Sequence, residues 1–245
     1  MRRILLTIEY YGKKFCGWQI QKNGPSIQEE IKRAIKEVTG EDVVLEGSGR
    51  TDAGVNAINQ TAHFDTKSSL PIHAFVPALN NILKTDIQIK SSCEVSSNFH
   101  ARYSAVKKTY IYKMYVSKTA SPLKDLFAMQ VTFDTLDMKG MNRACKFLKG
   151  EHDFTSFKSC RSKKENNIRT IYSARVYKNG DILEFKICGN GFLHNMVRII
   201  VGTLIDVGVK KLKPEDIKKI IEDKNRASAS ETAAAHGLYL QSVEY

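Results

Sequence analysis

Apolar positions in the first hundred residues alternate with polar ones in some segments and recur every three or four residues in others, which predicts strands and helices respectively. The predicted strands cover residues 4–10, 43–46, 61–65 and 87–95, and the predicted helices cover residues 27–40 and 75–83. The first helix has defined ends, because Ser26 and Glu29 form a capping box and Gly40 stops it. This half of the chain therefore contains the elements of a sheet with two helices.

The second half repeats this order of elements. Strands are predicted over residues 106–116, 126–133 and 238–244, and helices over residues 136–148, 192–206 and onward from Pro214. Asn179-Gly180 separates two further alternating segments, which is the strongest hairpin signal in the chain. Strand–helix–strand order twice over predicts an α+β fold of two sheet-and-helix domains, residues 1–105 and 106–245, with mainly antiparallel sheets. No Pro/Gly linker marks the boundary, so we expect the two domains to pack closely.

The charge balance changes the picture from an ordinary globular protein to one with an anionic partner. Lysine and arginine number 38 against 26 aspartates and glutamates, which gives a formal net charge of +12. Nucleic acid is the simplest partner for such an excess. An anionic membrane surface is the alternative, but it calls for a basic amphipathic helix, and the sequence contains no convincing one.

The cysteines and the first residues indicate the compartment. The five cysteines are odd in number and far apart, and no C-x-x-C occurs, so neither a zinc ribbon nor a disulfide framework is predicted. Reduced thiols fit a cytoplasmic protein. The apolar run at the start stops at Glu9, which is too short for a signal peptide, and no run is long enough to span a membrane. We therefore expect a cytoplasmic protein without a membrane segment.

The stretch Gly47–Ala57, "GSGRTDAGVNA", places Arg50 and Asp52 two residues apart on a glycine-rich loop. An ordinary polar turn is one interpretation, since Gly, Asp and Thr are common turn residues. A phosphate-binding loop is excluded, because Asp52 occupies the place of the third glycine of G-x-G-x-x-G and no G-K-[ST] follows. The local pattern alone leaves open why a carboxylate and an arginine share so flexible a loop.

Cations alternate with tyrosines in "FHARYSAVKKTYIYKMY", Phe99 to Tyr115. Aromatic rings stack on unstacked bases while cations contact phosphates, so the pattern is typical of a surface that holds single-stranded or looped RNA. On a strand, Tyr110 and Tyr112 share one face, and Tyr115 lies on the other. The alternative is an amphipathic strand whose tyrosines are core residues, and the positive charge of the chain favours RNA.

A second basic cluster lies in "KSCRSKKENNIR", a polar loop with two interpretations. Its cations are Lys158, Arg161, Lys163, Lys164 and Arg169. They form either a solvated surface or a loop that grips phosphates.

Arg198 stands in "FLHNMVRIIVGTLI", where nearly every neighbour is apolar. A buried guanidinium needs a partner, because an unpaired buried charge costs several kcal/mol. His194 lies one turn earlier on the same predicted helix face. Three interpretations stay open: a helix with one wet edge, a contact with a backbone carbonyl, or an ion pair with a carboxylate such as one held on a glycine loop.

The common metal and nucleophile motifs are missing from the sequence. The six histidines show no H-E-x-x-H or H-x-H spacing, and neither the H-x-E…P-C-x-x-C deaminase signature nor a G-x-S-x-G nucleophile elbow occurs. Metal-free chemistry, or none, is what these absences leave.

Five blocks in this order resemble the bacterial tRNA pseudouridine synthase A (TruA) family. They are "GRTDAGVNA", "FHARYSA" followed by "KKTYIYKMY", "GEHDFTSF", "GNGFLHNMVRIIVG" and "AHGLYL", spread from residue 49 to residue 240. The resemblance thus covers essentially the whole chain. Two positions depart from it: Asn56 stands where the family more often has histidine, and Ala234 where it more often has proline.

The resemblance implies the pseudouridine synthase fold, with two domains around a basic cleft, and the isomerisation of uridine to pseudouridine at positions 38 to 40 of tRNA. By resemblance, Asp52 is the nucleophile and Arg50 holds the space or phosphate vacated by the flipped nucleotide. Tyr110 stacks on the extruded uracil, with its hydroxyl available for proton transfer. Arg198 pairs with Asp52 and keeps it ionised. No cofactor or metal is implied, because the product is an isomer of the substrate.

The partners that the resemblance implies are the anticodon stem-loop of tRNA and a second copy of the chain in a homodimer. An RNA-binding module without catalysis is the alternative from another class. It shares the charge and the tyrosines, but it does not need Asp52 on a glycine loop or a buried arginine to meet it.

Overall fold

The computed structural model describes residues 1–83, 85–160 and 166–245, which form two compact units. The N-terminal unit consists of Met1–Val106 with Tyr239–Tyr245, and the C-terminal unit of Lys107–Leu238. Each combines a β-sheet with α-helices, so the predicted α+β fold is confirmed. The division departs from the predicted ranges 1–105 and 106–245 at the end of the chain. The last strand joins the N-terminal unit because it pairs there, a long-range contact that no local pattern reveals.

The N-terminal unit is built on strands in the order β4-β1-β3-β10. They are β1 (Arg2–Tyr10), β3 (Asn56–Thr66), β4 (Ile87–Val95) and β10 (Leu238–Glu244), with a short β2 (Glu46–Gly47) beside β3. β1 runs antiparallel to β3 and β4, and β10 runs parallel to β3. The inner strand β1 is thus paired on both sides. Its alternate residues Ile4, Leu6 and Ile8 are buried, so one face of the strand belongs to the core.

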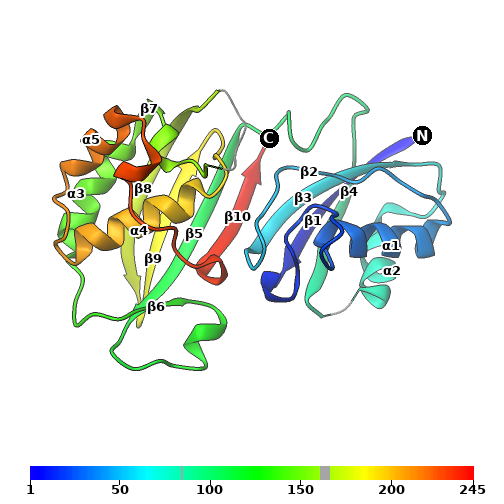
Figure 1. Ribbon diagram of the computed structural model, residues 1–245. Coiled ribbons are helices and arrows are strands. Elements are labelled where there is room, and N and C mark those ends of the chain that lie inside the picture. The colour runs from blue at the N-terminus through cyan, green and yellow to red at the C-terminus, as the bar shows by residue number, and fades with distance from the viewer. Residues whose placement is uncertain (84, 161–165) are drawn as a thin grey trace. The chain divides into compact units, whose positions relative to one another are not determined.

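Two helices, α1 (Ile27–Thr39) and α2 (Phe75–Ile82), lie next to each other on one face of this sheet (Figure 1). The predicted capping box is present in part: the Ser26 hydroxyl accepts a hydrogen bond from the Glu29 amide at 3.3 Å. Gly40 ends α1 with a φ of 75°, a left-handed conformation that glycine adopts without strain. The apolar face of α1 is buried, and Phe75 of α2 contacts Phe64 of β3 edge-on.

The C-terminal unit contains strands in the order β5-β9-β8-β7. Its strands are β5 (Lys107–Val116), β9 (Ile182–Gly189), β8 (Ile168–Asn179) and β7 (Gly150–Asp153), and a short β6 (Met129–Val131) runs parallel to β5. β8 and β9 form the predicted hairpin, with Asn179 opposite Ile182 and a φ of 60° at Gly180. This turn confirms the Asn-Gly signal.

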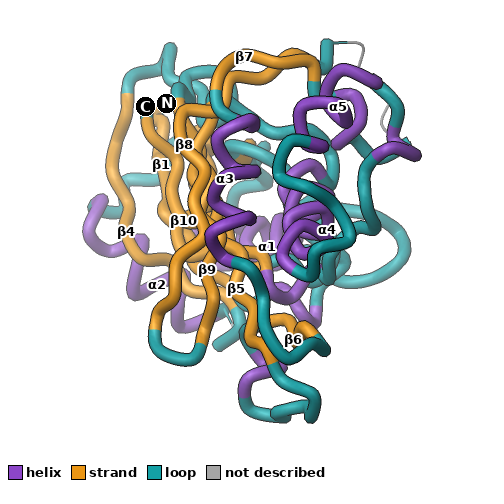
Figure 2. The backbone as a smooth tube through the Cα atoms, turned by 90° about the vertical axis from the view of Figure 1, so that its left-hand side faces the viewer, coloured by secondary structure: helices purple, strands orange, loops and turns teal. Residues whose placement is uncertain are grey.

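Three helices, α3 (Met138–Leu148), α4 (Met196–Gly208) and α5 (Asp216–Asp223), lie on one side of the C-terminal sheet (Figure 2). α4 is the most buried, since nine of its residues, among them Ile199, Ile200 and Leu204, face the interior. Short 3₁₀ turns complete the two units at Gly12–Lys14, Ile72–Ala74, Lys124–Leu126, Thr155–Phe157, Arg226–Ser228 and Ala235–Gly237.

Three predicted elements are shorter than the sequence indicated. The strand expected over 43–46 is reduced to Glu46–Gly47, and the strand expected over 126–133 to Met129–Val131, which follows a 3₁₀ turn. The helix expected from Phe192 begins at Met196, because Asn195 takes a left-handed φ of 62° that a helix does not continue. His194 therefore lies before the first turn of α4, so the prediction that it shares a helix face with Arg198 is wrong.

Candidate active site

The glycine-rich loop connects β2 to β3, two strands that pair with each other. Its first residue is tied to β3, because the Ser48 amide donates to the Thr61 carbonyl at 2.8 Å. The loop then closes in a tight turn, in which the Val55 amide donates to the Asp52 carbonyl at 3.1 Å and Gly54 has a φ of 77°. Asp52 thus stands at the start of a defined turn.

Thr51 anchors the loop between the two charged residues. Its side chain is 7% exposed, and its hydroxyl shares a hydrogen bond of 2.7 Å with the hydroxyl of Tyr10 on β1. Its carbonyl accepts a hydrogen bond from the Trp18 amide at 3.0 Å. Burial raises the pKa of Tyr10 well above its ordinary value, so this hydroxyl stays protonated at neutral pH. Thr51 thus anchors the loop in the interior, whereas its neighbours Arg50 and Asp52 are exposed and half-buried respectively.

Gln60 of β3 holds the first part of the loop with both ends of its amide. The Gln60 Oε1 accepts from the Ser48 hydroxyl at 2.6 Å, and the Gln60 Nε2 donates to the Gly49 carbonyl at 3.0 Å. The side chains of Ser48 and Gln60 are both fully buried. An amide is suited to this position because it offers a donor and an acceptor at once.

The segment Gly17-Trp18 packs directly against the loop. Gly17 has a φ of 101°, and a Cβ there would lie 2.6 Å from the Thr51 carbonyl oxygen. A Cβ on Gly47 would lie 2.6 Å from the Trp18 ring. Both glycines are therefore needed for close approach. Sequence reasoning missed Tyr10, Gly17, Trp18 and Gln60 as supports of Asp52, since nothing in their local sequence marks them.

The tyrosines of β5 divide between the two interpretations that the sequence left open. Tyr112 and Tyr115 are core residues, 0% and 1% exposed. The Tyr112 hydroxyl donates to the Ala234 carbonyl at 2.7 Å, and the Tyr115 hydroxyl donates to Asp125 Oδ1 at 2.6 Å. Tyr110, opposite Ile187 of β9, is half-buried and meets Phe192 edge-on, with ring centroids 5.1 Å apart. Tyr110 is thus partly accessible to solvent, unlike Tyr112 and Tyr115.

Arg198 lies in the first turn of α4 and is half-buried. Its Nε donates to the Ala233 carbonyl at 2.7 Å, and its Nη1 donates to Asn195 Oδ1 at 2.9 Å. The Ala233 amide in turn donates to the Arg198 carbonyl at 3.2 Å. The backbone-carbonyl contact that the sequence offered as one possibility is therefore present.

The segment Ala233-Ala234 joins the arginine to the tyrosine strand, because Arg198 binds one of these carbonyls and Tyr112 binds the other. Burial raises the pKa of the Tyr112 hydroxyl, and the charge of Arg198 opposes that rise. Within the C-terminal unit, Arg198 is thus linked through this segment to β5, the strand that carries Tyr110. Arg50 and Asp52 belong to the N-terminal unit.

The basic loop is described only at its two ends. Arg161, Lys163 and Lys164 lie outside the described residues. Lys158 and Arg169 are half-buried, and burial lowers the pKa of the Arg169 guanidinium. The Arg169 Nη1 donates to the Asn166 carbonyl at 3.2 Å, so this guanidinium already holds the backbone at the start of β8.

Neither a metal cluster nor a membrane span is found in the described part of the chain. No three His, Cys, Asp or Glu side chains among residues 1–83, 85–160 and 166–245 are grouped so as to hold a metal ion. No helix in these ranges is long and apolar enough to cross a membrane.

Comparisons with known proteins give the family. The family model for tRNA pseudouridine synthase matches residues 6–104 and 144–245. The tRNA pseudouridine synthase A of Caldicellulosiruptor bescii is 48% identical over the full length of both chains. That of Francisella tularensis subsp. tularensis is 41% identical over 100% of this chain and 95% of its own.

The chain belongs to the tRNA pseudouridine synthase family. Membership makes it an isomerase and confirms the resemblance found in the sequence. Among solved structures, a chain of the Cbf5–Nop10–Gar1 complex has 11% identity and a TM-score of 0.38, over 96% of this chain and 57% of that one.

The matched ranges place three of the four candidate residues of this synthase within the family model. Arg50 and Asp52 fall in the first matched range and Arg198 in the second, whereas Tyr110 falls in the unmatched segment between them. The two departures from the family pattern take part in backbone contacts. Asn56 Oδ1 accepts a hydrogen bond from the Gly12 amide at 2.8 Å, and the Ala234 carbonyl accepts one from the Tyr112 hydroxyl.

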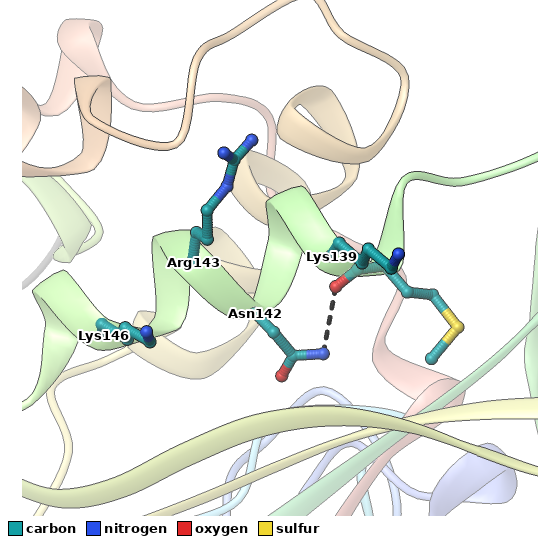
Figure 3. A pocket seen from close by; sticks show the side chains of 5 residues that line it. Lys139, Asn142, Arg143 and Lys146 are labelled. Carbon is teal, nitrogen blue, oxygen red and sulfur yellow. Dashed lines mark hydrogen bonds between the residues drawn. The ribbon is translucent and has the colours of Figure 1, made fainter.

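A surface depression of about 330 Å³ lies beside α3 of the synthase and includes none of the four candidate residues (Figure 3). It is lined by Met138, Lys139, Asn142, Arg143 and Lys146. Asn142 Nδ2 donates to the Met138 carbonyl at 3.0 Å and to the Val176 carbonyl of β8 at 2.8 Å. Asn142 therefore ties α3 to the sheet, and the depression is bordered by exposed cations.

Proposed function

We propose that the chain isomerises uridine to pseudouridine at positions 38 to 40, in the anticodon stem-loop of tRNA, with Asp52 as the nucleophile. The observation that carries the proposal is the setting of Asp52 within the matched range 6–104. Asp52 is a half-buried carboxylate that follows a buried, doubly anchored Thr51. A turn with no chemical task does not need such support, whereas a nucleophile must be held in position.

The reaction balances without a cofactor. The bond between N1 of uracil and C1′ of ribose breaks, and a bond between C5 and C1′ forms. The proton leaves C5, and N1 gains one, so that substrate and product have the same composition. The base must leave the helical stack for these atoms to be reached.

In this proposal the loop of the N-terminal unit supplies two roles. Asp52 forms the covalent link that holds the nucleotide between bond cleavage and bond formation. Arg50 is exposed next to it and contacts the space or phosphate that the flipped nucleotide leaves. The glycines on either side let the backbone approach RNA closely.

The C-terminal unit supplies the other two roles in this proposal. Tyr110, a half-buried residue, stacks on the extruded uracil, and its hydroxyl moves the proton from C5. Arg198, fixed by the Ala233 carbonyl and by Asn195, is the cation that keeps the Asp52 carboxylate ionised.

The surroundings of the reaction belong to the proposal as well. The net charge of +12 supports a polyanionic substrate. The described cysteines, all free thiols, support a reducing compartment, which we take to be the cytoplasm. A homodimer is proposed on the family resemblance, and a concentration-independent mass of twice 27.6 kDa in solution would support it.

The test is to incubate an unmodified tRNA transcript with the purified protein and to map pseudouridine by nucleotide position. We expect pseudouridine at positions 38 to 40, and a transcript with cytidines at these positions is the matched control. Pseudouridine elsewhere in the tRNA would refute the proposed region, and no pseudouridine in any tRNA would refute the proposed reaction.

A further inference from the structure

Ring side chains in the N-terminal unit form a row of edge-on and tilted contacts that runs from the interior to solvent. His63 of β3 is 5% exposed, and its ring centroid lies 4.8 Å from that of His100. The His100 centroid lies 4.4 Å from that of Tyr103, which is 76% exposed. The Arg102 guanidinium carbon lies 5.5 Å from the centroid of the Tyr103 ring. The outer end of this row of rings is therefore an aromatic ring with a cation over it.

The inner part of this row is supported by a second set of rings. Phe99 meets His63 edge-on at 6.3 Å and Tyr245 of the C-terminal segment at 4.6 Å. The His63 Nδ1 accepts a hydrogen bond from the Ala101 amide at 3.2 Å, so the backbone of residues 99–104 fixes the orientation of the His63 ring. Tyr245 donates its hydroxyl to the Ala101 carbonyl at 2.9 Å.

The backbone of residues 99–104 is held independently of any ligand. The His100 amide donates to the Ser104 hydroxyl at 3.0 Å, and the Ser104 amide donates back to the His100 carbonyl at 2.9 Å. The Arg3 Nη1 donates to the Phe99 carbonyl at 2.7 Å. A ligand that lands on Tyr103 thus finds a preformed surface, and little conformational entropy is lost on binding.

An exposed tyrosine by itself is ordinary on a protein surface. Tyr172 on β8 is such a residue: it is 44% exposed, and among the described residues it has no ring or cation contact. Tyr103 differs from it by the tilted contact with the His100 ring and by the guanidinium of Arg102 over its own ring. Aromatic rings with an adjacent arginine are the surfaces on which unstacked bases are held.

We propose that Tyr103 and Arg102 form a stacking platform for an unpaired base of the RNA substrate, a base other than the uridine that reacts at Asp52. The platform rests on the proposed function, because it assumes that the ligand is RNA. Stacking supplies affinity that is independent of base identity, while the Arg102 guanidinium contacts the neighbouring phosphate or the base plane.

The experiment measures the equilibrium Kd for unmodified tRNA by filter binding, with each substitution placed in wild-type and in Asp52→Asn protein. Tyr103→Ala should weaken binding about tenfold, within the range that one base stack contributes. Tyr103→Phe should restore wild-type Kd, because the ring is kept. Tyr172→Ala is the matched control and should leave Kd within twofold. Melting temperature, measured for each variant, should stay unchanged, since the Tyr103 side chain is exposed.

Salt dependence separates stacking from charge. Tyr103→Ala should leave the slope of log Kd against log salt unchanged, whereas Arg102→Gln should lower its magnitude by about one. A Tyr103→Ala variant that binds like Tyr172→Ala, or a Tyr103→Phe variant that binds no better than Tyr103→Ala, would overturn the platform. Pseudouridine formation by the wild type is scored separately, so loss of the platform and loss of the proposed reaction are distinguishable.

Discussion

Two segments of the N-terminal unit differ in how far they expose the side chain to which we assign a function. The loop Gly47–Ala57 is fixed by hydrogen bonds from buried polar side chains, and its carboxylate Asp52 stays half-buried. The turn Phe99–Ser104 is held by backbone hydrogen bonds and by ring contacts, and its Tyr103 projects into solvent. Hydrogen bonds define the position of single atoms, which chemistry requires, whereas an exposed ring offers area, which binding requires. Substitutions in the loop should therefore lower kcat, and substitutions in the turn should raise Kd.

Asp52→Asn is expected to have the largest effect of all. The change is nearly isosteric, and a turn would tolerate it, since Asn suits turns as well as Asp. A neutral amide cannot form the covalent link, so no pseudouridine should be detected by nucleoside analysis. Gel-shift affinity for tRNA should stay within about tenfold of wild type, a change of at most roughly 1.4 kcal/mol. Loss of binding in parallel with turnover would make Asp52 a binding residue and end the contrast between loop and turn.

Tyr110→Phe sharpens the comparison, because it removes a hydroxyl to which we assign a catalytic role. The same substitution at Tyr103 should have no effect, since only the ring is expected to act there. Removal of the Tyr110 hydroxyl should lower kcat by about 10²- to 10⁴-fold, the usual contribution of a positioned acid or base. The Kd for tRNA should not change, since the stacking ring is kept. Single-turnover rates at saturating enzyme, read beside the Kd, give both numbers. Near-wild-type turnover would leave Tyr110 with stacking alone.

Thr51→Val tests the support of the loop without touching a charge. The side chains have the same shape, but the buried Tyr10 hydroxyl loses its 2.7 Å partner. We expect a free energy of unfolding lower by about 1–2 kcal/mol. A displaced Asp52 should also lower kcat about tenfold while KM stays unchanged. Thr51→Ser keeps the hydroxyl and should recover kcat, whereas equal kcat values for the two variants would show that the anchor only stabilises the fold.

His63 carries the smallest predicted effect, on stability. Burial, with Arg3 and His100 nearby, lowers the pKa of His63 below its ordinary value of 6.5. The unfolded chain therefore binds a proton first as pH falls through 6.5, and the folded state loses stability from pH 7 toward pH 5. In His63→Gln, which keeps an acceptor for the Ala101 amide, the unfolding free energy should fall less over this range. The exposed His73→Gln is the control, and a slope equal to that of the control would contradict the assignment.

Local signals in the sequence predicted the parts of the fold that local interactions decide. Ser26 caps α1, Gly40 ends it, and Asn179-Gly180 forms the β8–β9 turn. The glycines around Asp52 likewise drew attention to the loop. Asn195 has a left-handed backbone although it is not a glycine. Nothing in the local sequence indicated that α4 would begin only after this residue.

The supports of the candidate site could not be predicted, because they are contacts between distant residues. Tyr10 and Thr51 are 41 positions apart, and neither belongs to a motif that names the other. Tyr112 and Tyr115 are both buried although they lie on opposite faces of β5, and Tyr103 lies in the turn before that strand, so the division of the tyrosines between core and surface was visible only in the folded chain. Roles for Asp52, Arg50, Tyr110 and Arg198 came from the family resemblance and stay predictions.

Release of tritium from tRNA labelled at C5 of uridine tests the central claim most directly, since formation of the C5–C1′ bond displaces that hydrogen. The account predicts that the wild-type protein releases one tritium for each pseudouridine formed, and that Asp52→Asn releases none while it still shifts tRNA in a gel. Tritium release by Asp52→Asn at a rate near that of the wild type would contradict the account.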